Sequence, residues 1–209
     1  MKSSLDKAHH SIFNNKNLKR LYKSLSVFLG IIWFFLAVFA ISAYVTRKYV
    51  YPLKYKTEIL YYAETYGLNS ALVFAVVKTE SSFDQNAISS AGAVGLMQIT
   101  KPTGAFIAQK LGINDYQLLD AQTNLNFGCF YLRYLFNRFS DEDTALVAYN
   151  AGEGNVALWL NNPDYSKDGQ TLFFIPFNES REYIKKIHKN FEKYEKLYGN
   201  ILDKSKFFE

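Results

Sequence analysis

The most constraining feature of this sequence is an uncharged apolar segment near its beginning. Residues 25–45 (LSVFLGIIWFFLAVFAISAYV) contain no Asp, Glu, Lys or Arg. With a rise of about 1.5 Å per residue, a helix of this length spans about 30 Å, which is the thickness of the hydrocarbon core of a bilayer. The segment therefore predicts a single-pass transmembrane anchor.

Two other interpretations of this segment remain open. A cleaved signal peptide is compatible with the small residues near its end, Ala40, Ser42 and Ala43. Signal peptides, however, usually have apolar regions of only about 7–15 residues, which favours the anchor. A buried core helix is disfavoured because the bulky run 33–35 (WFF) leaves no polar face.

The positive charge of the chain is concentrated before the apolar segment. Lys and Arg number 24 against 19 Asp and Glu, a net charge of +5. Residues 1–24 contain six basic residues and one Asp, so this tail accounts for the whole excess and the remainder is balanced. The charge therefore predicts no nucleic-acid partner, and it fits a basic cytoplasmic tail under the positive-inside rule. Basic residues also follow the segment closely, so charge alone does not decide which end of the helix faces the cytoplasm.

The remainder is long enough for one ordinary domain of mainly helical structure. Apolar residues make up 49% of the chain, which excludes a disordered protein. A single Cys and three His exclude a disulfide scaffold and give no indication of a metal site. The pattern predicts a juxtamembrane connector over 46–56, a domain over 57–200 and a tail over 201–209. Helix-period patterns predict helices near 57–67, 69–82, 103–112, 122–139, 142–150, 153–160 and 178–198. Asn178 is the expected cap of the last helix, and residues 171–177 could form a short extended piece.

One carboxylate stands on an apolar helix face. Val73, Val76, Val77 and Glu80 follow the i, i+3, i+4, i+7 spacing of a single face. Burial favours the neutral acid, and so does the negative end of the helix dipole near the serines at 81 and 82. Glu80 is therefore a candidate proton donor near neutral pH, with a structural ion pair or a helix cap as the alternative.

Two small-residue segments follow that suit ligand binding. The loop 84–95 (DQNAISSAGAVG) permits close approach to the backbone and leads to Gln98, whose amide offers both a donor and an acceptor. Tyr149 and Asn150 end an apolar helical run before Gly152. A tight turn and a core tyrosine are the structural alternatives for these two segments.

These motifs together resemble those of the SLT-type lytic transglycosylases. The resemblance rests on residues 80–83 (ESSF), Ala87, Ser89, residues 95–98 (GLMQ) and residues 148–152 (AYNAG), with NLNFGCFYLRYLFNRF between them and PFNESREYIKKI after them. It covers about residues 57–200 and implies a mainly α, goose-lysozyme-like fold that acts on peptidoglycan. The chain departs from the family's usual pattern at Ser180, where threonine is common.

The resemblance also implies a set of roles. Glu80 would be the sole catalytic acid and base, and the substrate-binding residues would be Ser89, Gln98, Tyr149, Asn150 and Tyr183. Glu80 would protonate the glycosidic oxygen after MurNAc, and the C6 hydroxyl would then close a 1,6-anhydro ring, with no cofactor and no metal. The partner would be the glycan strands, which places the domain outside the cytoplasmic membrane. The sequence gives no indication of a protein partner.

Other functions remain as alternatives. A muramidase on the same fold would use Asp84 or a held water, because ordinary glycoside hydrolysis requires a second carboxylate or an activated water. A membrane-tethered, inactive peptidoglycan-binding module is the second alternative. Serine or cysteine catalysis is disfavoured because His188 lies in a basic helix and Cys129 in an apolar one.

Overall fold

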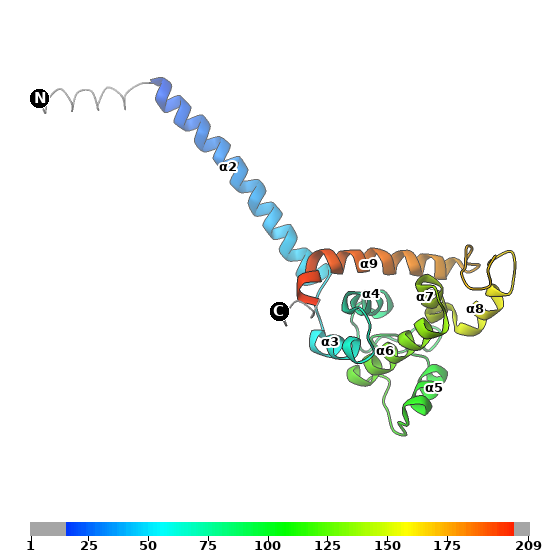
Figure 1. Ribbon diagram of the computed structural model, residues 1–209. Coiled ribbons are helices and arrows are strands. Elements are labelled where there is room, and N and C mark those ends of the chain that lie inside the picture. The colour runs from blue at the N-terminus through cyan, green and yellow to red at the C-terminus, as the bar shows by residue number, and fades with distance from the viewer. Residues whose placement is uncertain (1–15, 203–209) are drawn as a thin grey trace, which may run out of the picture. The chain divides into compact units, whose positions relative to one another are not determined.

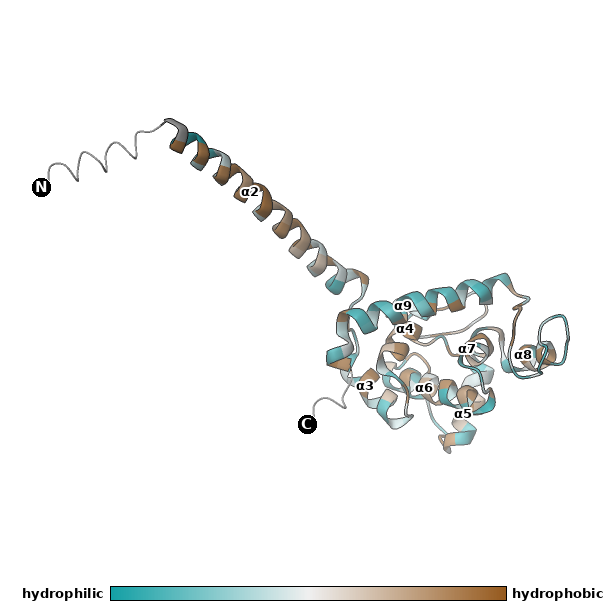
Figure 2. Cartoon of the chain, turned by 45° about the horizontal axis from the view of Figure 1, so that its top comes forward, coloured by the Kyte–Doolittle hydropathy of each residue, from teal (hydrophilic) through white to brown (hydrophobic). Residues whose placement is uncertain are grey.

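The computed structural model describes residues 16–202, which form two units divided at Pro52 and Leu53. In the first unit, α2 (Lys16–Val45) is followed by five further helical residues in π geometry, η1 (Thr46–Val50). The range Leu18–Val50 is long and apolar enough to cross a membrane, and Figure 2 shows the apolar colour along most of α2. The described part thus contains the helix predicted over 25–45, and the helix runs on into the predicted connector. The first 15 residues of the basic tail and the tail from 203 lie outside the described residues.

The second unit is a helical domain (Figure 1). Its elements are α3 (Lys56–Thr65), α4 (Ser70–Ser81), α5 (Lys101–Leu111), α6 (Ala121–Arg138), α7 (Glu142–Ala151), α8 (Glu153–Leu160) and α9 (Asn178–Leu202). The mainly α fold is therefore confirmed. Within residues 16–202 the only β pairing is two isolated antiparallel bridges, from Val94 to Ile88 and to Ile99.

The helices begin where their capping residues stand. Asn69 accepts hydrogen bonds from the backbone N–H groups of Ala71 and Leu72, and Asp120 and Asp141 do the same for α6 and α7. At α9 the expectation was wrong by one residue, because Asn178 is the first helical residue and the Phe177 carbonyl accepts from Arg181 N. The segment 171–177 contains bends instead of the extended piece considered from sequence.

The core is built around α4. Every residue of α4 from Ala71 to Val77 is buried, and α9 packs along this helix (Figure 1). The rings of Phe74 in α4 and Tyr194 in α9 lie 5.2 Å apart, centre to centre. Because α4 carries Glu80 at its end, the same packing that forms the core fixes the position of this carboxyl group.

Candidate active site

Glu80 lies in the last turn of α4, at the edge of the core. The helix ends just beyond it because Ser82 and Phe83 adopt left-handed backbone angles, with φ of 52° and 66°. The side chain is only partly exposed. Burial is the largest cause that raises the pKa of Glu80 from 4.5 to about 7, and the negative charge of Glu179 raises it further. The buried environment and the raised pKa expected from the sequence are present, and the role of Glu80 as a proton donor stays a prediction.

Tyr183 lies beside this carboxyl group. Its hydroxyl donates a hydrogen bond of 2.7 Å to Glu80 Oε1 from the beginning of α9. This bond opposes the effect of burial, because it stabilises the carboxylate and lowers the pKa of Glu80. The Tyr183 ring is itself buried, and burial together with the nearby carboxylate raises its own pKa well above 10.0. Tyr183 therefore stays a hydrogen-bond donor throughout the range in which Glu80 titrates.

Tyr149 and Asn150 are positioned by bonds to other parts of the site. The Tyr149 hydroxyl donates to the Met97 carbonyl at 2.8 Å, and the charge of Glu80 contributes to the raised pKa of this tyrosine. Asn150 Oδ1 accepts a hydrogen bond of 2.6 Å from the hydroxyl of Ser180, which is buried. Tyr149 thus connects the end of α7 to the loop between α4 and α5, which we call the site loop. Asn150 connects the same end of α7 to α9.

Gln98 and Ser89 shape the loop between α4 and α5. Gln98 has φ of 49°, and its Nε2 donates to the carbonyls of Ala87 at 3.2 Å and Gly95 at 2.9 Å. Ser89 Oγ accepts from Ala93 N at 3.0 Å. The sequence expectation that Gln98 offers a donor to a ligand is therefore wrong in this respect, since both amide hydrogens are used within the loop. Its Oε1, an acceptor, receives no hydrogen bond within residues 16–202 and stays available.

Asn124 of α6 holds this loop, and sequence reasoning missed it. Its Oδ1 accepts from Met97 N at 2.7 Å, and its Nδ2 donates to the carbonyls of Val94 at 2.9 Å and Leu118 at 2.7 Å. The residue is only 1% exposed. The approach is so close that a Cβ on Gly95 would lie 2.2 Å from Asn124 Nδ2. A polar residue on the buried face of an apolar helix was the signal that could have identified it.

The other candidate groups of the sequence are engaged elsewhere. Asp84 is exposed, and its Oδ1 accepts from Asn86 N at 2.9 Å in a turn. His188 lies on the exposed face of α9, where Nε2 is 2.6 Å from Asp143 Oδ1. Cys129 is completely buried, and burial raises the pKa of its thiol. In residues 16–202 no group of three His, Cys, Asp or Glu is placed to hold a metal ion.

Residues 58–181 match the sequence model of the transglycosylase SLT domain. The chain belongs to this family. A soluble lytic murein transglycosylase of Salmonella typhimurium is 34% identical to it over 143 residues, which are 66% of this chain and 22% of the relative. A membrane-bound lytic murein transglycosylase C of Edwardsiella ictaluri is 28% identical over 173 residues, 69% of this chain and 47% of the relative. The SLT chain described here thus spans less than half the length of these relatives.

Solved structures share the fold of this SLT domain. An inactive variant of the lytic transglycosylase Slt of Pseudomonas aeruginosa, in which glutamine replaces a glutamate, superposes with a TM-score of 0.61 and 27% identity. The match covers 80% of this chain and 28% of that protein. The 70-kDa soluble lytic transglycosylase of Escherichia coli also has a TM-score of 0.61, with 29% identity over 70% of this chain and 25% of that protein. The lysozyme-like fold expected from the sequence is therefore confirmed.

Proposed function

We propose that this SLT protein is a membrane-anchored lytic transglycosylase of peptidoglycan. It cleaves the β-1,4 bond between MurNAc and GlcNAc without water and leaves a 1,6-anhydro-MurNAc end. The observation that carries the proposal is the partly buried Glu80, whose pKa is raised to about 7 and whose Oε1 accepts a hydrogen bond from Tyr183. The family and the names of its relatives support the substrate class.

In the first step Glu80 acts as an acid. At neutral pH a pKa of about 7 leaves a large fraction of Glu80 protonated. Because Tyr183 donates to Oε1, the acidic proton belongs on Oε2. Transfer of this proton to the glycosidic oxygen lets the bond from C1 of MurNAc to that oxygen break, and the substrate's N-acetyl group helps to stabilise the developing charge at C1.

In the second step the Glu80 carboxylate acts as a base. It takes the proton of the C6 hydroxyl while that oxygen forms a bond to C1, which restores the protonated acid and consumes no water. The Tyr183 hydrogen bond stabilises the carboxylate between the two steps. An internal hydroxyl is an effective nucleophile because it is already held beside C1. Ser89, Gln98, Tyr149 and Asn150 bind the sugars in this proposal, with Gln98 as an acceptor.

A hydrolase would need a second carboxylate or an activated water. Asp84 is engaged in a turn, but the exposed Glu179 is close enough for its charge to raise the pKa of Glu80. Glu179 is therefore the carboxylate that a two-carboxylate muramidase would use. Exchange of this residue separates the two mechanisms, because a lytic transglycosylase retains its activity without Glu179, whereas a two-carboxylate hydrolase loses it.

The test is mass spectrometry of the muropeptides that the detergent-solubilised full chain releases from purified sacculi. We expect anhydro ends with the unaltered chain and with Glu179→Gln, and no release with Glu80→Gln, which preserves the size of the side chain and removes its proton. Reducing ends would identify a muramidase and refute the transglycosylase. Release at an unchanged rate from Glu80→Gln would remove Glu80 from the mechanism, and binding without any product would identify a binding module.

The apolar helix places this activity at the membrane in our proposal. The range Leu18–Val50 is long enough to span a bilayer, and a relative is described as membrane-bound. Peptidoglycan lies outside the cytoplasmic membrane, so the basic tail is inside and the SLT domain outside. The test is protease treatment of intact spheroplasts. Degradation of the domain supports this orientation, whereas protection of the domain until the membrane is opened would refute it.

A further inference from the structure

The outer face of α9 carries a row of lysines. The inner face is buried and contains Tyr183, Ile184, Ile187, Tyr194, Tyr198 and Leu202. On the exposed face, Lys186, Lys189, Lys193 and Lys196 follow one another at spacings of three, four and three residues. These spacings place the four side chains, which we call the lysine row, on one side of the helix over about 15 Å.

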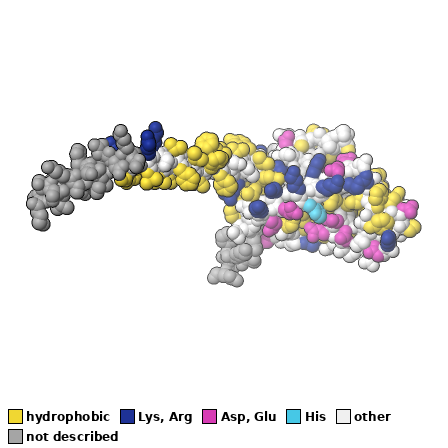
Figure 3. All heavy atoms as spheres, turned by 90° about the horizontal axis from the view of Figure 1, so that it is seen from above, with side chains coloured by type: hydrophobic (Ala, Val, Ile, Leu, Met, Phe, Trp, Pro, Cys, Tyr) yellow, Lys and Arg dark blue, Asp and Glu magenta, His cyan; other side chains and the backbone are white. Residues whose placement is uncertain are grey.

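Acidic residues also lie on α9. Glu182 is one turn before Lys186 on the same side, and its pKa is lowered by the hydrogen bond and charge of Lys185 and then by the charge of Lys186. Lys185 forms a salt bridge with Glu182, and His188 Nε2 lies 2.6 Å from Asp143 Oδ1. Within the described part of the chain, no member of the lysine row forms a salt bridge. Figure 3 shows the basic side chains in a row along the face seen from above, with acidic side chains gathered along one side of it. The row is therefore a concentrated positive strip on a domain whose overall charge is close to balanced.

The lysine row ends near the point where the chain enters the domain. Leu60 and Glu64 of α3 line one pocket together with Glu195 and Leu202 of α9, so the beginning of the domain adjoins the end of α9. Only residues 51–55 separate η1 from α3. Five extended residues reach at most about 18 Å, so this connector limits how far the beginning of α3 can lie from the end of η1.

We propose that the lysine row docks the SLT domain on the anionic phospholipid headgroups of the membrane to which the chain is anchored. This inference rests on the membrane anchoring proposed above. A surface of anionic lipid attracts each nearby lysine, and the attraction falls off within a Debye length of about 8 Å at physiological salt. The short connector supplies the required proximity, and the row supplies the complementary charge.

Docking through the lysine row has a consequence for the enzyme. Tyr183, which contacts Glu80, lies one turn before Lys186 on the same rigid helix. A helix lying along the headgroups holds the Glu80 site at a fixed height above the membrane. The enzyme would then cleave the glycan strands nearest the membrane in preference to those farther out.

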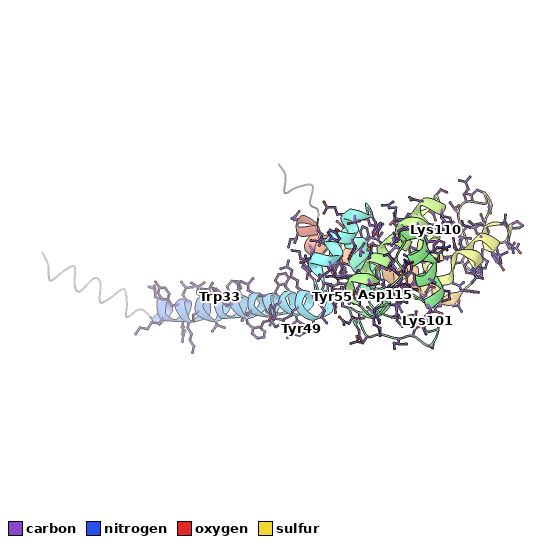
Figure 4. The ribbon with its side chains drawn as sticks, turned by 90° about the horizontal axis from the view of Figure 1, so that it is seen from below. Trp33, Tyr49, Tyr55, Lys101, Lys110 and Asp115 are labelled. Carbon is purple, nitrogen blue, oxygen red and sulfur yellow. The ribbon has the colours of Figure 1, made fainter. Side chains whose placement is uncertain are left out.

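Amine labelling of the full chain in nanodiscs tests the docking. The chain is inserted into discs of phosphatidylcholine or of phosphatidylglycerol, treated briefly with an acetylating ester and analysed by peptide mass spectrometry. We expect each member of the row to be labelled about five-fold more slowly on phosphatidylglycerol, and this protection to disappear in about 1 M salt. Lys101 and Lys110 of α5, both exposed and labelled in the view of the opposite side in Figure 4, are internal controls with equal labelling on both lipids.

Paired lysine-to-glutamine substitutions test whether the charges of the lysine row cause the protection. Lys189→Gln with Lys193→Gln should abolish the protection of Lys186 and Lys196, whereas Lys101→Gln with Lys110→Gln should leave it intact. Equal labelling of the row on both lipids, or protection that persists in high salt, would overturn the proposal. Protection by added sacculi on phosphatidylcholine discs would assign the row to the wall and would also overturn it. Two controls are measured on the same sample. Release of muropeptides in detergent shows whether activity is retained, and resistance to carbonate extraction shows whether the chain is still anchored, so loss of docking is distinguished from both.

Discussion

The raised pKa of Glu80 predicts that replacing this proposed catalytic residue stabilises the protein above about pH 4.5, and by the full amount above about pH 7. In the unfolded chain the carboxyl group ionises near pH 4.5, and in the folded protein near pH 7. Between these values the folded state holds a proton that the unfolded state has lost, so raising the pH through this window lowers the stability. The full cost at pH 8 is about 3 kcal/mol, because each pKa unit corresponds to about 1.4 kcal/mol.

Glu80→Gln removes this cost and keeps an acceptor for the Tyr183 hydroxyl. We therefore expect the variant to be about 3 kcal/mol more stable at pH 8, a rise in Tm of roughly 8 °C for a domain of this size, and no more stable near pH 4.5. The measurement is urea and thermal unfolding of the full chain in detergent at both pH values, with Glu192→Gln, an exposed glutamate of α9, as the matched control. An equal difference at the two pH values, or a loss of stability at pH 8, would refute the assignment of a buried, proton-holding carboxyl group.

Three further substitutions test the remaining contacts of the site. Tyr183→Phe removes the bond that lowers the pKa of Glu80, so the alkaline limb of activity should move to higher pH and turnover should fall roughly ten-fold; an unmoved limb would contradict the role of the hydroxyl. Glu179→Gln removes a charge that raises the same pKa, so the limb should move to lower pH, and a shift upward would contradict this. Asn124→Ala leaves Met97 N without its acceptor and should destabilise the domain by about 3 kcal/mol in urea unfolding; a loss below about 1 kcal/mol would mean that the loop does not depend on Asn124.

The fold and the buried surroundings of Glu80 were predictable because the signals for them are local, whereas the role of Glu80 as the acid stays a prediction. The spacing of Val73, Val76 and Val77 before Glu80 defines the buried face of α4, and all three valines are completely buried in the structure. Asn69 and Asp141 cap α4 and α7, which begin within one residue of the starts predicted at 69 and 142. The resemblance to known motifs supplied the roles that periodicity cannot give, including the position of Tyr183 at the site.

The contacts that organise the site loop were not predictable in the same way. Gln98 was expected to bind a ligand through its donor, but its amide hydrogens are used by carbonyls three and eleven residues earlier in the chain. Asn124 lies 27 residues from Met97, whose backbone it holds. Such bonds depend on how a loop of small residues folds back against α6, and no local pattern of the sequence encodes that approach.

The chemistry that we propose for the site depends on a balance between two effects that shift the pKa of Glu80 in opposite directions. A mechanism with a single residue requires Glu80 to give up a proton and then to recover one, which is most efficient when its pKa lies near the working pH. Burial alone would hold the proton too tightly for the first step, and the Tyr183 hydrogen bond alone would leave too little acid at neutral pH. Burial is supplied by α4 within the core, whereas the hydroxyl is supplied by α9, and the packing of α9 along α4 brings the two together. Any substitution that loosens this pair of helices should therefore shift the pH range of activity before it unfolds the domain.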